Sequence, residues 1–289
     1  MDLDGIILID KDEGITSFDT VQKVKRFFSI KKAGHAGTLD KAASGLIVIC
    51  INRATSAQNL FMSTFKRYRA TMVFGEETDT LDRYGTIVRT SQVREYSDEE
   101  IYNILNMFLG KTLQEPPRFS AIHKDGKRLY KRALEGEKFE VDPREIEIKE
   151  LKVLDRNEKS LTFEVLSSRG TYIRALGRDI ARQLGSCGYL TKLRRLESGH
   201  FSVEDAVQLS ALSKNSAIIP LNEALKDIPQ IKVSRDLVGL IYQGGSIVKI
   251  FSPTELDQLK KGYNRVTFEN RLIAIIKQEE HPSYFKVFN

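Results

Sequence analysis

The chain has 289 residues, a formal net charge of +6, two cysteines and no tryptophan. A chain of this length buries about three quarters of its unfolded surface, so it forms one large domain or two smaller ones. Cys50 and Cys187 lie far apart in the sequence, a spacing that indicates neither a disulfide framework nor a zinc site. Because no basic-then-apolar leader and no membrane-length apolar run is present, we expect a soluble cytoplasmic protein that does not associate with membranes.

The first fifty residues predict two buried strands separated by a helix. Residues 5–9 and 45–51 are apolar and rich in β-branched side chains, which is typical of buried strands. Between them Thr16 or Ser17 can cap a helix. The predicted core face of this helix consists of apolar residues at helical spacing, namely Phe18, Val21, Val24 and Phe28.

The middle of the chain mixes strands and helices. Residues 68–75 alternate between apolar and polar side chains and predict a strand. Ser97 and Glu100 form a capping box that predicts a helix running up to Gly110. Further along we expect strands at residues 145–154 and 161–167 and a helix at residues 173–184. Because these elements lack a regular βαβ rhythm, the pattern favours an α+β fold over a doubly wound sheet.

The sequence pattern changes after residue 228, and we place a domain boundary there that gives units 1–227 and 228–289. Short β-like runs follow, separated by Gly, Asn and Pro turns. They predict a small β-barrel or sandwich, which by its pattern alone is a β appendage without a defined role. The runs are residues 231–233, 246–251, 265–268, 271–277 and 284–288.

Basic residues are clustered between residues 169 and 195, which contain seven Lys or Arg and one acid, Asp179. On the predicted helix, three arginines repeat at intervals of four and form one stripe. Such a stripe is either an ordinary solvated face or a surface that repels itself until a polyanion binds. The stripe consists of Arg174, Arg178 and Arg182.

A Gly-rich loop around Asp40 is the most informative segment. Residues 20–39 contain five Lys or Arg and no acid, so Asp40 is the first negative charge after a basic arm. An Asp in a Gly-rich segment before a strand also suits a simple turn. The wider sequence favours a functional role, because residues 34–40 read Gly-His-Ala-Gly-Thr-Leu-Asp and are followed by Ala-Ala-Ser-Gly after Lys41.

This loop resembles the active-site loop of the bacterial tRNA pseudouridine-55 synthases, the tRNA pseudouridine synthase B family. Further motifs agree in order: Lys-Arg-Tyr-Arg at residues 66–69, Ser-Arg-Gly-Thr-Tyr-Ile-Arg at residues 168–174, and the segments 116–130 and 189–199. The resemblance implies a mixed, mostly antiparallel central sheet flanked by helices, with a PUA-like RNA-binding domain at residues 228–289. It also implies that the enzyme isomerises uridine to pseudouridine at position 55 in the T-arm of tRNA.

The resemblance assigns roles to individual residues. Asp40 is the catalytic residue, Arg174 pairs with it, and Tyr68 stacks on the everted uracil. His35, Tyr172 and Leu193 fall at other substrate-contacting positions. An Arg beside a carboxylate favours its ionised form and orients it through a guanidinium fork. Base stacking on an aromatic ring contributes about 1–3 kcal/mol, comparable to part of the cost of flipping a nucleotide.

The resemblance also bounds cofactors and partners. The isomerisation involves no redox change, so we expect no cofactor and no metal, and we expect a monomer without an obligatory protein partner. Arg178, Arg182 and Arg194 are predicted, as basic residues of the cleft, to contact RNA phosphates. The chain departs from the family pattern at four positions, because Asp12 and Lys41 replace prolines, His123 replaces Lys and Leu134 replaces Arg.

Two other functions remain open from the sequence. A non-catalytic RNA-binding or tRNA-folding protein would explain the basic cluster but not the ordered motifs. A hydrolase of N-glycosidic bonds would more usually need a second acid or base and a positioned water. The product separates these cases, because an isomer of unchanged mass indicates the synthase and free uracil indicates the hydrolase.

Overall fold

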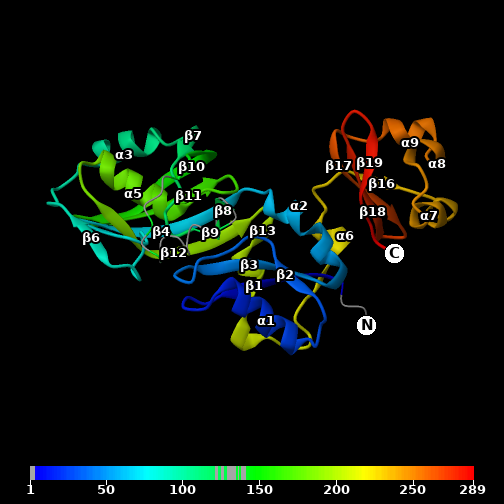
Figure 1. The fold of residues 1–289 in the computed structure, drawn as a ribbon, viewed down its shortest axis with the longest axis horizontal. Coiled ribbons are helices and arrows are strands. Elements are labelled where there is room, and N and C mark those ends of the chain that lie inside the picture. The colour runs from blue at the N-terminus through cyan, green and yellow to red at the C-terminus, as the bar shows by residue number, and fades with distance from the viewer. Residues whose placement is uncertain (1–3, 121–122, 125–126, 129–134, 136, 138–140) are drawn as a thin grey trace.

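The computed structural model describes residues 4–120, 123–124, 127–128, 135, 137 and 141–289. A large sheet flanked by helices occupies most of the molecule, and a smaller sheet with its own helices lies at the C-terminal end (Figure 1). Two features of the family resemblance are affected. Segment 116–130 lies partly outside the described residues, and Leu134 lies wholly outside them. The α+β class is confirmed.

The large sheet is mixed and mostly antiparallel, as expected. Its strands are β1 (Gly5–Lys11), β2 (Ala33–His35), β3 (Ser44–Ile51), β4 (Lys66–Phe74), β7 (Gly110–Gln114), β10 (Arg144–Asn157), β11 (Ser160–Ser167), β12 (Gly188–Ser198), β13 (Phe201–Ser202), β14 (Val207–Gln208) and β15 (Ile219–Pro220). The order is β14-β1-β3-β12-β4-β11-β10-β7, with β2, β13 and β15 paired to β3, β12 and β1. The pairs β12–β3 and β1–β14 run parallel, and the other pairs along this path run antiparallel.

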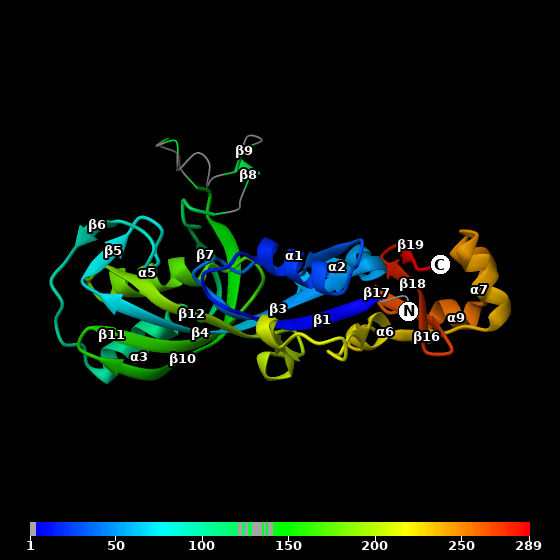
Figure 2. The same cartoon turned by 90° about the horizontal axis from the view of Figure 1, so that it is seen from below.

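Helices and two short hairpins complete this part. The helices are α1 (Ser17–Phe27), α2 (Gln58–Met62), α3 (Asp98–Asn106), α5 (Ile173–Gln183) and α6 (Leu221–Ala224), with short 3-10 helices at Asn52–Ala57, Val203–Asp205 and Leu209–Ala211. The hairpins pair β5 (Glu76–Thr78) with β6 (Ile87–Thr90), and β8 (His123–Lys124) with β9 (Lys127–Arg128). Viewed from below, the described elements form an elongated arrangement with the two sheets side by side (Figure 2).

Helix α1 begins as predicted, with Thr16 as its N-cap in a capping box with Asp19. The predicted core face was wrong at Phe18, which is 66% exposed. Ser17 takes the inward position instead, because its hydroxyl donates to the Leu39 carbonyl at 2.9 Å and accepts from the Leu39 N–H at 2.8 Å. A serine that binds backbone at a buried position breaks the apolar pattern and ties the helix to the loop that precedes Asp40.

The middle elements follow the sequence with one shortened helix. Ser97 caps α3 in the predicted capping box, but the helix ends at Asn106 rather than at Gly110. Helix α5 starts after Tyr172, and its apolar side packs on β4 and β12. Its buried apolar residues are Ile173, Ala175, Leu176, Ile180 and Ala181.

The C-terminal part is a four-stranded sheet with three short helices, not the predicted barrel or sandwich. Its strands are β16 (Gln230–Lys232), β17 (Gly262–Phe268), β18 (Arg271–Gln278) and β19 (Pro282–Val287), in that order. Its helices are α7 (Arg235–Tyr242), α8 (Ile247–Ile250) and α9 (Pro253–Asp257).

Helix α8 replaces the strand predicted at residues 246–251. Ile247 and Phe251 are buried, Ile250 is half-buried, and Val248 is 58% exposed. This is the i, i+3, i+4 spacing of a helix that packs through one face. The spacing was hard to recognise from the sequence, because four of the six residues at 246–251 are apolar.

The C-terminal sheet packs directly against the large sheet. Ile275 of β18 and Phe288 belong to the same buried apolar cluster as Ile6, Leu46 and Ala57. A shared apolar core fixes one sheet on the other more firmly than a flexible tether would. The position of the C-terminal sheet relative to the large sheet is therefore set by the packing of their shared apolar side chains.

Candidate active site

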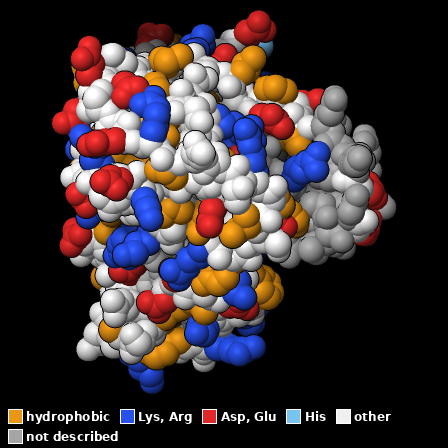
Figure 3. Space-filling view, turned by 90° about the vertical axis from the view of Figure 1, so that its left-hand side faces the viewer, with side chains coloured by type: hydrophobic (Ala, Val, Ile, Leu, Met, Phe, Trp, Pro, Cys, Tyr) orange, Lys and Arg blue, Asp and Glu red, His pale blue; other side chains and the backbone are white. Residues whose placement is uncertain are grey.

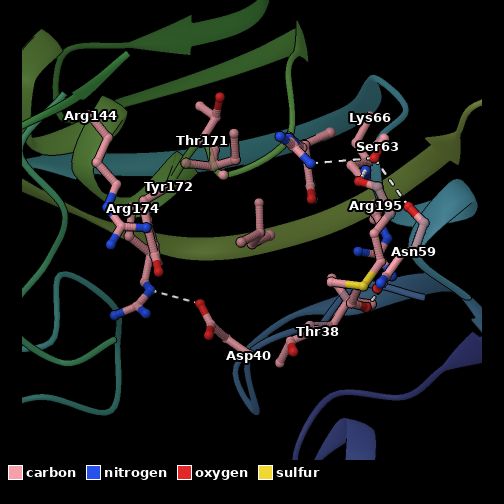
Figure 4. Close-up of a pocket in the computed structure, with 18 of the residues that line it drawn as sticks. Thr38, Asp40, Asn59, Ser63, Lys66, Arg144, Thr171, Tyr172, Arg174 and Arg195 are labelled. Atoms are coloured by element: carbon pink, nitrogen blue, oxygen red, sulfur yellow. Dashed lines mark hydrogen bonds and ion pairs between the residues drawn. The ribbon is translucent and has the colours of Figure 1, made fainter. Parts of the chain in front are cut away.

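A cleft of about 900 Å³ opens between the loop after β2, strands β4 and β12, and the start of α5. Five of the residues predicted for the site line it: Asp40, Tyr68, Tyr172, Arg174 and Leu193. Figure 4 shows Arg174, Tyr172 and Arg144 on one side, Lys66, Ser63 and Arg195 on the other, and Asp40 pointing toward Arg174. The cleft is large enough to take a nucleotide with its neighbouring phosphates.

Asp40 and Arg174 form the ion pair that the sequence predicts. The Arg174 Nε donates to Asp40 Oδ2 at 2.8 Å, and the arginine side chain is only 6% exposed while that of Asp40 is 40% exposed. The two terminal guanidinium nitrogens donate to the backbone carbonyls of Thr80 and Phe119. Arg174 therefore makes one hydrogen bond to Asp40 rather than the predicted bidentate pair. Its two terminal nitrogens bind backbone carbonyls instead, and these bonds fix the position of the guanidinium.

The loop around Asp40 is fixed without the usual proline at position 41. The Gly14 N–H donates to the Lys41 carbonyl at 2.9 Å, and the Ala43 N–H donates to the Asp40 carbonyl at 3.0 Å. Together with the Ser17 contacts to Leu39, these bonds hold the backbone on both sides of Asp40. The replacement of proline by Lys41 thus leaves the loop anchored through backbone hydrogen bonds.

Lys11 supports the same loop and was not singled out from the sequence. Its side chain is fully buried, and its ammonium donates to the carbonyls of Asp12 and Ile15, each at 2.9 Å. Burial lowers the pKa of Lys11 to about 8, while the nearby Asp40 carboxylate acts in the opposite direction. Lys11 therefore closes the turn that contacts Lys41 and adds positive charge behind Asp40.

The wall of the cleft between these groups is aromatic and apolar. Tyr68 lies on β4, opposite Arg195 of β12 and Val165 of β11, and packs beside Leu193. Tyr172 directly precedes α5; its backbone N–H donates to Gln114 Oε1 at 2.8 Å, and Gln114 Nε2 donates back to its carbonyl at 3.1 Å. Burial raises the pKa of the Tyr172 hydroxyl. These aromatic and apolar side chains offer surfaces on which a base flipped out of the RNA can stack.

His35 is not brought into the cleft. It lies on β2 opposite Ile49 and is half-buried, and its Nδ1 finds no hydrogen-bond partner among the described residues. Burial, assisted by the positive charge of Arg195, lowers the pKa of its imidazole. A contact between His35 and RNA stays a prediction.

The three arginines predicted to contact phosphates lie outside the lining of the cleft, and each already has an acid. Arg178 pairs with Asp179 at 2.8 Å, Arg182 with Glu77 at 2.9 Å, and Arg194 with Asp10 through two bonds of 2.7 and 2.9 Å. Figure 3 shows Lys and Arg interspersed with Asp and Glu over one end of the molecule. The stripe of Arg174, Arg178 and Arg182 does not repel itself, because each of these arginines pairs with an acid. The acids are Asp40, Asp179 and Glu77, of which Asp40 and Glu77 come from distant segments of the chain.

Other cations line the cleft instead. Arg144, Arg169, Lys66 and Arg195 face it from β10, the loop before α5, β4 and β12. Lys66 and Arg195 belong to recognised sequence motifs, but neither was predicted to have a role in the site. A signal was available for Lys66, because it precedes Tyr68 by two residues on the same strand and so shares its face. Arg195 pairs in register with Tyr68 in the structure.

The described residues contain no group of three or more His, Cys, Asp or Glu side chains that could hold a metal ion. In the same part of the chain, no helix has the length and apolar composition needed to cross a membrane.

Comparisons with known proteins agree with this geometry. The profile described as TruB family pseudouridylate synthase (N terminal domain) matches residues 25–173, which include Asp40, Tyr68 and Tyr172. The tRNA pseudouridine synthase B of Aquifex aeolicus is 40% identical over 252 residues, covering 85% of this chain and 88% of that protein. The protein of the same name from Borrelia garinii is 38% identical over 275 residues, covering 94% of each chain.

Solved structures show the same fold. A Cbf5-Nop10-Gar1 complex gives a TM-score of 0.71 at 23% identity, covering 94% of this chain and 78% of that one. An H/ACA RNP bound to a substrate RNA containing 2'-deoxyuridine gives 0.69 at 21% identity, covering 95% and 78%. With the matches in sequence and the paired Asp40 and Arg174 in the cleft, this chain belongs to the TruB family of pseudouridylate synthases.

Proposed function

We propose that this protein isomerises uridine to pseudouridine at position 55 in the T-arm of tRNA, with Asp40 as the essential residue. The observation that carries the proposal is the 2.8 Å contact between Asp40 and the buried Arg174 on one side of a cleft wide enough for a nucleotide. Relatives that align with nearly the whole chain carry the name tRNA pseudouridine synthase B. Family membership and site geometry thus support the same reaction.

The chemistry fits a site with one carboxylate. The reaction breaks the bond between N1 of uracil and C1′ of ribose and joins C5 to C1′, while a proton leaves C5 and N1 gains one. Asp40 acts on the target uridine as nucleophile or base, and Arg174 pairs with the carboxylate and orients it. Because atoms and electrons balance within the nucleotide, the reaction needs no cofactor.

Tyr68 serves as the stacking platform for the everted uracil, and Tyr172 and Leu193 confine the base. The three side chains line one cleft with Asp40. Stacking on an aromatic ring offsets part of the few kcal/mol that flipping a nucleotide costs, so the base remains in the cleft long enough to react.

Residues 228–289 act as a PUA-like RNA-binding unit beside the catalytic unit 1–227. Tyr263 of β17 lines the same cleft as Asp40, and the two sheets share an apolar cluster. An RNA that enters the cleft therefore contacts both units. We assign the protein to the cytoplasm, where tRNA is modified, and propose that it works as a monomer without a protein partner.

The test is to incubate the purified protein with an unmodified tRNA transcript and map the product. We expect one pseudouridine at position 55 and an RNA of unchanged mass. Release of free uracil would indicate an N-glycosidic hydrolase, and tight binding with no modified nucleotide would indicate a tRNA-folding protein. Either result would overturn the proposed function.

A further inference from the structure

Three cations lie on the side of the cleft away from Arg174 and have no acidic partner. They are Lys66, Arg169 and Arg195, and no carboxylate lies within 4.0 Å of any of them in the described part of the chain. From this arrangement we infer that the three form a binding site for one phosphodiester of the RNA, beside the flipped nucleotide. The inference rests on the proposed function and adds the group that holds the RNA backbone.

Arg195 is the strongest element of this site. It is 1% exposed, yet its neighbours are neutral: Nε donates to the Leu46 carbonyl at 2.6 Å and Nη2 to the Gly37 carbonyl at 3.2 Å. The remaining nitrogen, Nη1, has no partner among the described residues, and Arg195 lines the cleft. A buried charge without a counter-ion is costly, so this free nitrogen marks a place for an anion.

Gly37 keeps the space in front of this nitrogen open. A Cβ added at Gly37 would lie 3.5 Å from Arg195 Nη1 and 3.9 Å from Lys66 Cε, and the backbone there has a φ of +108°. The positive φ favours glycine, and a Cβ there would stand in van der Waals contact with both cations and occupy the space in front of them. The absent side chain leaves a recess whose walls are a guanidinium and the end of a lysine.

Lys66 and Arg169 complete the recess. Lys66 is 6% exposed, and its ammonium donates to the carbonyls of Met62 at 2.7 Å and Thr64 at 2.6 Å, which leaves one of its three N–H groups. Burial and the positive charges of Arg195 and Arg169 lower the pKa of Lys66 to about 8. Arg169 is exposed, and within the described part of the chain it donates only to the Ser63 hydroxyl at 3.4 Å.

A phosphodiester fits this recess better than other anions that RNA or solvent offers. It carries one negative charge and two free oxygens, which match a guanidinium nitrogen and an ammonium side by side. A nucleotide that leaves its stack must also have its backbone held, and phosphate contacts supply that positioning in nucleic-acid complexes. Arg178, Arg182 and Arg194 do not compete for this role, because each is paired within the protein.

The test measures binding of T-arm stem–loop RNAs in which one phosphate near the target uridine is replaced by a neutral methylphosphonate. We expect wild-type protein to lose about tenfold in affinity at one particular linkage. Lys66→Met and Arg169→Gln should bind the unmodified RNA more weakly and lose the discrimination at that linkage. Lys159→Gln, which removes an exposed charge in the β10–β11 turn, should behave as wild type.

Thermal denaturation of each variant shows whether it is folded, and the exposed Arg169 gives a variant that leaves the buried groups untouched. If wild type binds every RNA of the set equally, or if both variants keep the full discrimination, the assignment is wrong. If inorganic phosphate stabilises wild type while no RNA linkage matters, the recess takes a free anion and the assignment is also wrong. Because binding is measured without turnover, the answer does not depend on whether pseudouridine is formed.

Discussion

The two sides of the cleft hold their buried arginines, Arg174 and Arg195, in opposite ways. On one side the buried Arg174 contacts a carboxylate, Asp40, and two backbone carbonyls. On the other side the buried Arg195 contacts two carbonyls, and its Nη1 has no partner among the residues that the structure describes. A guanidinium that is paired with an acid orients that acid for catalysis, whereas a guanidinium without an acidic partner can bind an anion of the substrate. The difference predicts that the side of Arg174 determines the rate of the reaction and that the side of Arg195 determines the affinity for RNA.

Removal of the acid should have the largest effect. Asp40→Asn keeps the size of the side chain and its contact with Arg174 but removes the negative charge. We expect tritium release from 5-tritiated uridine in tRNA to fall by about 10³-fold or more, with RNA affinity nearly unchanged. Appreciable turnover by this variant would remove Asp40 from its role.

The aromatic wall between the two sides should matter less. Tyr68→Leu keeps an apolar side chain next to Leu193 but removes the stacking face. We expect kcat/KM to fall by roughly 10- to 100-fold, in line with about 1–3 kcal/mol of lost stacking. Tyr68→Phe serves as the control because it retains the ring, and a loss as large as that of Tyr68→Leu would point to the hydroxyl instead.

The smallest expected effect is a pH dependence of RNA affinity. The pKa of Lys66 is lowered to about 8 in the free protein, and a bound phosphate would favour its charged form. Bound protein therefore holds a proton that free protein loses as the pH rises through 8, so affinity should fall several-fold between about pH 7.5 and 9.

Lys66→Met provides the control for this pH dependence. Lys11, whose pKa is also about 8, is present in both proteins, so the difference between their profiles reports Lys66. Identical profiles for wild type and Lys66→Met would contradict a charged Lys66 beside a phosphate.

Motifs of residues close in sequence were readable, and contacts between distant segments were not. The Asp40 loop and the segment 168–174 could be identified one at a time, and the structure joins them at 2.8 Å. The acids that neutralise Arg182 and Arg194 come from β5 and β1, so no local pattern reveals them. Arg195 lay in a recognised motif, yet its lack of an acidic partner among the described residues becomes visible only when its surroundings are known.

Secondary structure was predicted well where one physical signal dominated. Strand β3 is a continuous apolar run, the capping box at Ser97 marks the start of α3, and Thr16, one of the two predicted caps, begins α1. Errors arose where two signals compete. The apolar run at residues 246–251 suits a strand or a buried helical turn, and burial of Ile247 with Phe251 decides for the helix.

The most direct test of the division between the two sides compares Arg174→Lys with Lys66→Met in one experiment. RNA affinity and the single-turnover rate of pseudouridine formation at saturating protein are measured for both. We expect Arg174→Lys to lose about 100-fold in rate at nearly unchanged affinity, and Lys66→Met to lose affinity at nearly unchanged rate. If both variants change the same quantity, the division between the two sides is wrong.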